Sequence, residues 1–503
     1  MAQEKRASWS GQLAFVLATA ASAIGLGNLW RFPYLAAQYG GAAFIATYFV
    51  LFLILGVPLM ITEISLGRLT RRSQVSAYGQ LHPRWKGLGF LATVVPFLVT
   101  PYYCAIGGWV LKYFMVYLKA VCTGESTITT YVSSATAEVG ADAFFTDFIS
   151  SPLEPVLLTI IFVFIAAGVI LLGVKNGIEK ANLVMMPILL LAAILLAGYV
   201  VSMPGTGAGL KYYLIPDFQS FCDTSGHVSL ALVGKTILGA MGQMFYSLSI
   251  AMGILITYGS YMRREDSIGR SVLRVGLCDT LVAFLSGLTI VPMVYLFAVQ
   301  SGVTPEVIAA HGGDVAAAEH AAAQAAMNQG AGLMFITLPK VFATLGAAGP
   351  WIGLSFFLLV TFAAATSAIS IYEPCVAALR ETFGLRRSWA TATFTFWTIV
   401  LGALSALGFG PLRGITLFGK GLLEFFDFVT NSVIMPVLAL LTCVFIGWVV
   451  RPDRIISECE ADGRVMRTRK FYRFAIRYLA PILVLSIIIS EVCRVLGIGG
   501  WSI

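Results

Sequence analysis

The chain has 503 residues, of which 58% are hydrophobic and only 12% are charged. Soluble globular proteins carry charge on about a quarter of their residues, so this composition excludes an ordinary soluble enzyme or binding protein. The formal net charge of +8 comes from short segments between apolar runs, so we expect a lipid bilayer and no nucleic acid as partner.

Apolar segments long enough to cross a bilayer recur from one end of the sequence to the other, which predicts an all-α polytopic membrane protein. We expect eleven transmembrane helices, at residues 11–37, 41–67, 88–121, 155–173, 180–202, 230–261, 270–300, 347–382, 388–408, 421–450 and 474–496. Two connecting segments, 122–154 and 302–346, are long. The second contains an alanine-rich run, Val315–Met327, which predicts a short surface helix.

Basic residues gather in the segments that follow the second, sixth, eighth and tenth expected spans. They include Arg71, Arg72, Arg263, Arg264, Arg386, Arg387 and Arg451. Segment 123–154, on the opposite side, has no Lys or Arg. Because loops rich in Lys and Arg stay in the cytoplasm, we expect a cytoplasmic N-terminus and, with eleven spans, a C-terminus outside.

The first span contains an unusual stretch, Ala20–Pro33, with the sequence AASAIGLGNLWRFP. Gly25 and Gly27 weaken a helix by roughly 1 kcal/mol each relative to Ala. Asn28 and Arg31 are unfavourable in lipid unless they face protein, water or a ligand. The stretch predicts a broken helix whose unwound backbone binds a small molecule; the alternative is a kinked helix that packs closely through its small residues.

The sixth span repeats this irregularity in Gly242–Gly253, GQMFYSLSIAMG. Two interrupted segments, five spans apart, indicate a transporter built from inverted repeats, with its binding site at the bilayer midplane. We therefore expect a first repeat over 1–202, and a second over 203–450 that includes the outer segment 302–346. A cytoplasmic loop and the eleventh span follow in 451–503.

The motifs SAIGLGNLWRFPY, YYCAIGGW, GQMFYSLSIAMG and FAAATSAIS resemble those of the neurotransmitter:sodium symporters, above all the bacterial amino-acid transporters with eleven spans. The resemblance extends over nearly the whole chain. It implies a sodium-coupled symporter in the bacterial cell membrane that imports an amino acid by alternating access. No nucleophile–base pair or metal-binding cysteine spacing stands out, so we expect no enzyme.

The resemblance implies a substrate site in the middle of the molecule. Its expected residues are Ser22, Ala23, Leu26, Gly27, Val99, Tyr103, Tyr246, Ser247, Ser249, Met252, Ser367 and Ile371. Monoamine transporters of the family carry an aspartate where this chain has Gly25, so here there is room for the substrate's own carboxylate. Met252 is flexible and packs well against rings, which favours a hydrophobic or aromatic side chain.

The resemblance also implies two sodium ions bound by oxygen atoms. The expected ligands of site one are Ala23, Asn28, Ser247 and Asp279, and those of site two are Ala21, Ile24, Ala363, Thr366 and Ser367. Residues 363, 366 and 367 share one face of a helix. Alternatively, the hydroxyls of Thr366 and Ser367 bond to carbonyls of their own helix.

Asp279 also bears on chloride. Chloride-dependent relatives have a serine one turn further on, where this chain has Ala283, which offers no hydrogen-bond donor. A fixed carboxylate at Asp279 would supply the negative charge instead, so we expect transport to be independent of chloride. The alternative role for Asp279 is that of a structural buried acid.

Charged and aromatic residues at the two mouths match the gates of the family. The expected outer gate is Arg31 with Asp427, and the expected inner network is Arg6, Trp9, Tyr261 and Glu381. We expect Glu63 and Glu373 to accept from backbone donors of the broken sixth span. Two other functions stay open, a proton- or chloride-assisted carrier and a sensor that binds an amino acid without moving it. The oligomeric state also stays open.

Overall fold

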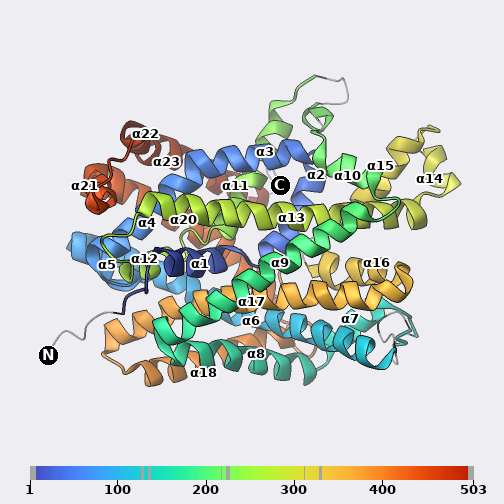
Figure 1. Cartoon of the computed structure of the whole chain (residues 1–503), viewed down its shortest axis with the longest axis horizontal. Helices are drawn as coiled ribbons and strands as arrows, with labels where there is room; N and C mark the ends of the chain where they lie inside the picture. The colour runs from blue at the N-terminus through green and yellow to red at the C-terminus, as the bar shows by residue number, and fades with distance from the viewer. Residues whose placement is uncertain are drawn as a thin grey trace.

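The computed structural model describes residues 7–125, 128, 130–133, 137–216, 218–222, 227–310, 312–327 and 331–496. Within these ranges the chain forms helices and connecting loops, without strands, so the predicted all-α class is confirmed. Most long helices run nearly parallel to one another along the longest axis of the molecule (Figure 1).

Several predicted spans are continuous α-helices. They are α6 (Lys86–Thr123), α8 (Glu154–Leu171), α13 (Ile268–Gly302), α17 (Gly349–Phe383) and α18 (Arg387–Leu407). Others contain π-helical turns. The second span consists of α3 (Ala42–Leu51), η2 (Phe52–Gly56) and α4 (Val57–Thr70), and the fifth of η4 (Val174–Glu179) and α9 (Lys180–Ser202). The tenth consists of α19 (Leu422–Asp427), η8 (Phe428–Ile434), α20 (Met435–Val444) and η9 (Phe445–Val450). The eleventh consists of α22 (Arg469–Phe474), η11 (Ala475–Leu479) and α23 (Ala480–Leu496).

Two predicted spans are broken. The first consists of α1 (Gln12–Ala23), η1 (Gly27–Arg31) and α2 (Phe32–Gln38), and the sixth of α11 (Leu230–Ser247) and α12 (Ile254–Ser260). By length and composition, nine segments of the described chain can cross a membrane, or ten when the bent first span is included. The sixth does not qualify because its halves are too short or too polar, so the count of eleven stays a prediction.

Short helices lie at the two ends of the bundle. At one end are α5 (Gln74–Leu81) and α21 (Pro452–Cys459), and towards the other are α7 (Ala141–Ser150), α10 (Gly207–Leu214), α14 (Pro305–Ala310), α15 (Val315–Ala326) and α16 (Leu338–Thr344) (Figure 1). The remaining short helices are η3 (Pro83–Trp85), η5 (Phe218–Phe221), η6 (Leu333–Thr337), η7 (Gly346–Ala348) and η10 (Glu460–Asp462). The basic loops flank α5, α12 and α21, which lie together at the left of Figure 1. The helix predicted in the alanine-rich run is confirmed as α15.

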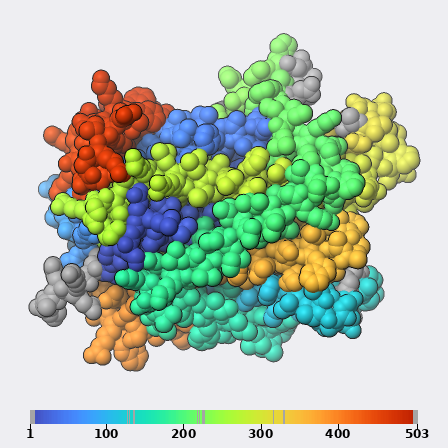
Figure 2. Space-filling model, in the orientation of Figure 1, coloured from blue at the N-terminus to red at the C-terminus, as the bar shows by residue number. Residues whose placement is uncertain are grey.

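The first span lies inside the bundle. Its helix α1 packs against α13 and α17, and most of its residues are buried. In Figure 2, α1 (dark blue) is visible only as a narrow band between α13 (yellow-green) and α9 (green). Asn28, which follows α1, is also fully buried, so it faces protein and the cost of placing it in lipid does not arise.

A buried ion pair fastens α21 to α4. Arg68 Nε lies 2.7 Å from Glu458 Oε1, and the two side chains are 0% and 4% exposed. A second guanidinium nitrogen, Nη1, donates to the carbonyl of Asp266, in the loop after α12, at 2.7 Å. Burial raises the pKa of the adjacent Cys459 thiol to about 11, as expected where water is excluded. Arg68 thus ties three separate segments together at one end of the bundle.

Replacing Arg68 by Ala should destabilise the protein by roughly 3–5 kcal/mol, because Glu458 would be left as an uncompensated buried charge. The matched control is Arg473→Ala, which removes an exposed pair with Asp453 and should change stability by less than about 1 kcal/mol. Thermal unfolding of the purified protein in detergent measures both. Equal melting temperatures for the two variants would contradict this assignment.

Candidate functional site

The first span is broken as the sequence predicts. Its α-helix ends at Ala23, Ile24 adopts an extended backbone with ψ of 96°, and the helix resumes at Gly27. The halves Gln12–Ala23 and Gly27–Gln38 are bent by 57° relative to each other. Backbone carbonyls and N–H groups that an intact helix would pair internally are therefore available at the break.

The two glycines at this break are required by close contacts. A Cβ atom on Gly25 would lie 2.7 Å from Ser367 Oγ, and one on Gly27 would lie 2.6 Å from Cδ1 of the Tyr246 ring. Both distances are shorter than side chains tolerate. Neither glycine has a positive φ, so the requirement is for space and not for an unusual backbone conformation.

The second break lies between Ser247 and Ile254, and its backbone is strained. Ser249 and Ala251 have φ of 55° and 61°, values that residues other than glycine rarely adopt. Glu63 Oε1 accepts a hydrogen bond from the Ala251 N–H at 2.8 Å, which confirms the expected partnership of this acid with the broken span. Such a bond helps to stabilise the unfavourable conformation.

Glu373 was also expected to accept from a backbone donor of the broken sixth span, and this expectation is wrong. Its Oε1 accepts from the Tyr261 hydroxyl at 2.8 Å and from Arg387 Nη1 at 3.1 Å. An arginine within reach gives the buried carboxylate a full countercharge, which a backbone N–H cannot supply.

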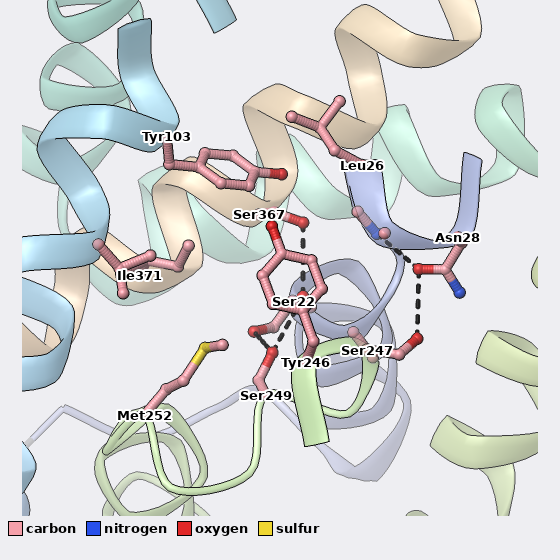
Figure 3. Close-up of a pocket in the computed structure, with 14 residues that line it drawn as sticks. Ser22, Leu26, Asn28, Tyr103, Tyr246, Ser247, Ser249, Met252, Ser367 and Ile371 are labelled. Atoms are coloured by element: carbon pink, nitrogen blue, oxygen red, sulfur yellow. Dashed lines mark hydrogen bonds between the residues drawn. The ribbon is translucent and has the colours of Figure 1, made fainter. Parts of the chain in front are cut away.

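The two breaks meet around one cavity (Figure 3). Gln243 Nε2 donates to the carbonyl of Gly27 at 3.1 Å, and the hydroxyls of Ser22 and Ser249 lie 3.0 Å apart. All twelve residues expected around the substrate line this cavity, together with Gly25 and Asn28. The cavity has an empty volume of about 320 Å³, but the centre of a water molecule can move through only about 20 Å³ of it. A bulky ligand therefore requires side chains such as Met252 to move.

Asp279 lies at the centre of a buried polar cluster that includes the residues expected at sodium site one. Its Oδ1 accepts from Asn28 Nδ2 at 2.8 Å and from Ser247 Oγ at 2.7 Å. Its Oδ2 accepts from the hydroxyl of Tyr48 at 2.8 Å. Asn28 and Ser247 come from the first and the second break, so this carboxylate links both breaks to α13. Ala23 lines the adjoining cavity.

The residues expected at sodium site two are also close together. Ser367 Oγ lies within hydrogen-bond distance of the carbonyls of Ala21 (3.3 Å) and Ile24 (3.1 Å), so it faces the break. Thr366 Oγ1 instead donates within its own helix, to Phe362 at 2.8 Å and to Ala363 at 3.1 Å. Thr366 therefore bonds within its own helix, which is the alternative that the sequence left open, whereas Ser367 does not.

The outer-gate residues do not form a direct ion pair, although both belong to the described part of the chain. Asp427 Oδ1 accepts from Asn431 Nδ2 at 2.6 Å, and the same nitrogen donates to the hydroxyl of Tyr102 at 3.2 Å. The guanidinium of Arg31 lies beside Gly242, where a Cβ would be 3.4 Å from Nη2. Their pairing as a gate stays a prediction.

The inner network is assembled in part. The Trp9 backbone N–H donates to the carbonyl of Tyr261 at 3.1 Å, and its ring nitrogen donates to the carbonyl of Tyr258, also at 3.1 Å. Glu381 Oε1 accepts from the backbone of Ser73 at 2.9 Å. Arg6 lies outside the described residues, so its expected place in this network is untested.

Sequence reasoning missed three polar residues of these clusters, namely Tyr48, Gln243 and Arg387. Tyr48 stands in an apolar run that differs little from other membrane helices, and its partner lies 231 residues away. Gln243 was part of the quoted motif, and a buried amide in the middle of a span was a signal that could have been read.

The sequence matches the sodium:neurotransmitter symporter family model over residues 6–145 and 148–499. The chain belongs to this family. Members of the sodium:neurotransmitter symporter family are transporters, which confirms that the protein is not an enzyme, and sodium dependence is shared by its relatives. A sodium-dependent transporter of Bacillus subtilis is 30% identical over 97% of this chain and 98% of its own length. The sodium-dependent serotonin transporter of Drosophila melanogaster is 25% identical over 97% and 77%.

Among solved structures, this family member is similar to the crystal structure of MhsT in complex with L-phenylalanine. The TM-score is 0.78 at 30% sequence identity, and the match covers 97% of this chain and 100% of that one. The two proteins therefore share their overall fold, and this chain is a multi-pass membrane transporter of a sodium-dependent family.

Gly27→Ala should lower the stability of the protein by roughly 1–3 kcal/mol, because the added methyl group must displace the Tyr246 ring from a packed site. Gly198→Ala is the matched control, since a Cβ there meets nothing within 4 Å and Ala favours the helix. Thermal unfolding in detergent compares them. If Gly27→Ala is as stable as Gly198→Ala, the close contact does not constrain the break.

Proposed function

We propose that this protein is a sodium-coupled symporter that imports a hydrophobic or aromatic L-amino acid by alternating access, without chloride. The observation that carries the proposal is the shared cavity at two helix breaks, which is lined by backbone and polar side chains of both breaks and by apolar side chains such as Val99 and Met252. The carboxylate of Asp279 lies next to it, bonded to the lining residues Asn28 and Ser247. A free amino acid presents the same combination of charged and apolar parts.

The substrate carboxylate would lie at the first break. Gly25 lines the cavity there without a side chain that would cover its backbone, and the N–H groups at the start of the resumed helix favour an anion. The hydroxyl of Tyr103 is buried beside this break, close to Ser367 and to the backbone of Leu26, and makes no hydrogen bond of good geometry with the described residues. Buried hydroxyls are normally paired, so a ligand carboxylate is a fitting acceptor. Ala23, Leu26 and Gly27 would complete this subsite with their backbone.

The substrate side chain would lie against Val99, Tyr246, Met252 and Ile371, with Ser22 and Ser249 below it. Val99, Tyr246, Met252 and Ile371 form the apolar wall of the cavity. MhsT, at 30% identity, was solved with L-phenylalanine, which supports an aromatic or large aliphatic substrate here. Rotation of the flexible Met252 would provide the additional space that such a side chain needs.

Sodium would bind at two places. At site one the ion would be held by the carbonyl of Ala23, the amide oxygen of Asn28, Ser247 and the carboxylate of Asp279, with the substrate carboxylate completing the shell. At site two it would be held by carbonyls of Ala21, Ile24 and Ala363, with Thr366 and Ser367 rotated towards it. Hard cations prefer oxygen ligands of these kinds.

Alternating access would follow from the two mouths. The outer pair Arg31 and Asp427 would close over the filled site, and the inner network of Arg6, Trp9, Tyr261 and Glu381 would then open. The basic loops near α5, α12 and α21 favour a cytoplasmic location for that end of the bundle. With eleven spans in a bacterial cell membrane, the C-terminus would lie outside.

A competition panel tests the proposal. Purified protein would be incubated with radiolabelled L-phenylalanine in sodium gluconate, with each of the twenty amino acids as competitor and potassium gluconate as reference. We expect binding only in sodium, with strong competition by hydrophobic or aromatic amino acids. Binding that needs chloride or a pH shift would favour the assisted carrier, and absence of counterflow in proteoliposomes would favour the sensor. If no amino acid binds in sodium, the proposal fails.

Asp279→Ser tests the explanation for chloride independence. The native protein should transport equally fast in chloride and in gluconate, because the carboxylate of Asp279 already accepts the three donors around it. The variant should be inactive or require chloride, since those donors would lack an anion. Sodium-gradient uptake into proteoliposomes measures both. Native uptake that falls in gluconate, or variant uptake that is unimpaired there, would contradict the explanation.

Gly25→Asp tests where the substrate carboxylate lies. The new charge should weaken binding of amino acids at least about 100-fold, because facing like charges cost several kcal/mol. Gly25→Asn is the matched control, which adds the same bulk without charge and should retain more affinity. Competition by phenethylamine, which lacks the carboxylate, should improve in Gly25→Asp. Equal losses in the two variants would place the carboxylate elsewhere.

A further inference from the structure

A second cavity lies between the last turns of α6, the helix α16 and the start of α17, towards the right of Figure 1 where α16 is labelled. It shares no lining residue with the central cavity. The centre of a water molecule can move through about 190 Å³ of it, against about 20 Å³ in the central cavity. A cavity of about 150 Å³ in another protein binds benzene. The second cavity therefore has room for an aromatic ring or a hydrocarbon chain of similar size.

The walls of this cavity carry no charged side chain. Val116 and Ala120 line it from α6, and Phe342 and Ala343 line it from α16. The rings of Phe342 and Tyr117 meet edge to face, with centroids 5.9 Å apart. An isolated charge is costly to bury beside such walls, so an occupant should be uncharged.

Tyr117 supplies the one polar side chain of the lining. The residue is only 7% exposed, and its ring stacks on Phe357 with centroids 5.4 Å apart. The ring also lies so close to α17 that a Cβ on Gly353 would be 2.2 Å from its Cε1, so it is held in place. Among the described residues its hydroxyl has no hydrogen-bond partner. Buried hydroxyls are normally paired, and a hydroxyl group on an occupant could donate to it or accept from it.

The rim of the cavity has the composition of a membrane interface. The lining residues Ala343 and Gly346 are exposed, so the cavity opens on their side. Met115, Leu118 and Trp351, which neighbour lining residues in the chain, are 44%, 42% and 61% exposed. Exposed tryptophan beside apolar side chains is typical of the level where lipid headgroups meet the hydrocarbon. Amphiphilic molecules concentrate at this level and could enter without passing through the central cavity.

We propose that the cavity between α6, α16 and α17 is a second ligand site, which binds an uncharged amphiphile with a hydroxyl group and a short hydrocarbon part. The hydroxyl group would pair with Tyr117, and the hydrocarbon part would lie against Val116 and Phe342. Because α16 forms one wall, an occupant would also hold α16 in place relative to α6 and α17. Binding here requires neither sodium nor an amino acid, so it is independent of the proposed function.

Photolabelling of the native protein in lipid nanodiscs tests the proposal. The probe is an octanol that carries a diazirine on its chain, and labelled peptides are mapped by mass spectrometry. We expect saturable labelling at lining residues of α6 and α16, with protection by 1-octanol. Octanoate at pH 8 has the same length but is charged. It should protect at least about tenfold less well, because its carboxylate would be buried without a counter-ion.

Two variants, Ala120→Leu and Ala343→Leu, fill the cavity from different walls, and each should weaken labelling at least about tenfold. Tyr117→Phe should weaken it about three- to tenfold, which is the usual value of one hydrogen bond. Ala347→Leu is the matched control, because Ala347 is exposed and does not line the cavity, and it should label like the native protein. Thermal unfolding checks that each variant is folded.

Labelling that does not saturate, that both filling variants retain, or that octanoate blocks as well as 1-octanol does, overturns the proposal. Native labelling affinity in Tyr117→Phe overturns the pairing of the hydroxyl group with Tyr117.

Discussion

The interaction on which the rest of the site depends is the buried carboxylate of Asp279. It accepts hydrogen bonds from Asn28 at the first break, from Ser247 at the second, and from Tyr48 on α3. A buried charge is tolerated only when donors or a counter-ion compensate it, so these contacts fix the positions of both breaks relative to α13. These three donors are neutral, so they satisfy the hydrogen bonds of the carboxylate but do not neutralise its negative charge. A sodium ion would complete the compensation, which explains in one step why cation binding and the geometry of the breaks would be coupled.

The same region is built with very little spare space. Gly25 and Gly27 permit approaches that a single methyl group would prevent, while Ser249 and Ala251 hold strained backbone conformations. The acid Glu63 supports that strain from α4. Strain of this kind persists only where surrounding contacts determine the conformation, and it is common in elements that must switch between two states. The narrow central cavity and the contact between Ser22 and Ser249 fit this view, since a ligand can enter only by rearranging side chains that are already packed.

The sequence predicted the helices and the location of the two breaks well, because glycine, asparagine and arginine inside an apolar run conflict with an intact membrane helix. The family motifs in the sequence also identified in advance the residues that line the central cavity. The sequence did not predict partners that are set by packing between distant segments. Tyr48 lies in an apolar run without a periodic signal, and the pairing of Glu373 with Arg387 depends on how two helices meet at one end of the bundle. The π-helical turns do have a local correlate that went unused. A proline, which lacks the backbone N–H of a regular helical bond, stands two residues after the end of η1, η2, η6, η8, η9 and η11.

The central claim is that sodium and an amino acid occupy adjoining places at the two breaks and stabilise each other. Binding linkage tests it most directly. The affinity of purified protein for L-phenylalanine would be measured across a range of sodium concentrations, and the affinity for sodium with and without saturating L-phenylalanine. Thermodynamic reciprocity requires the two ligands to tighten each other by the same factor. The account predicts a mutual increase in affinity of at least tenfold in chloride-free buffer. Amino-acid affinity that does not change with sodium would contradict it.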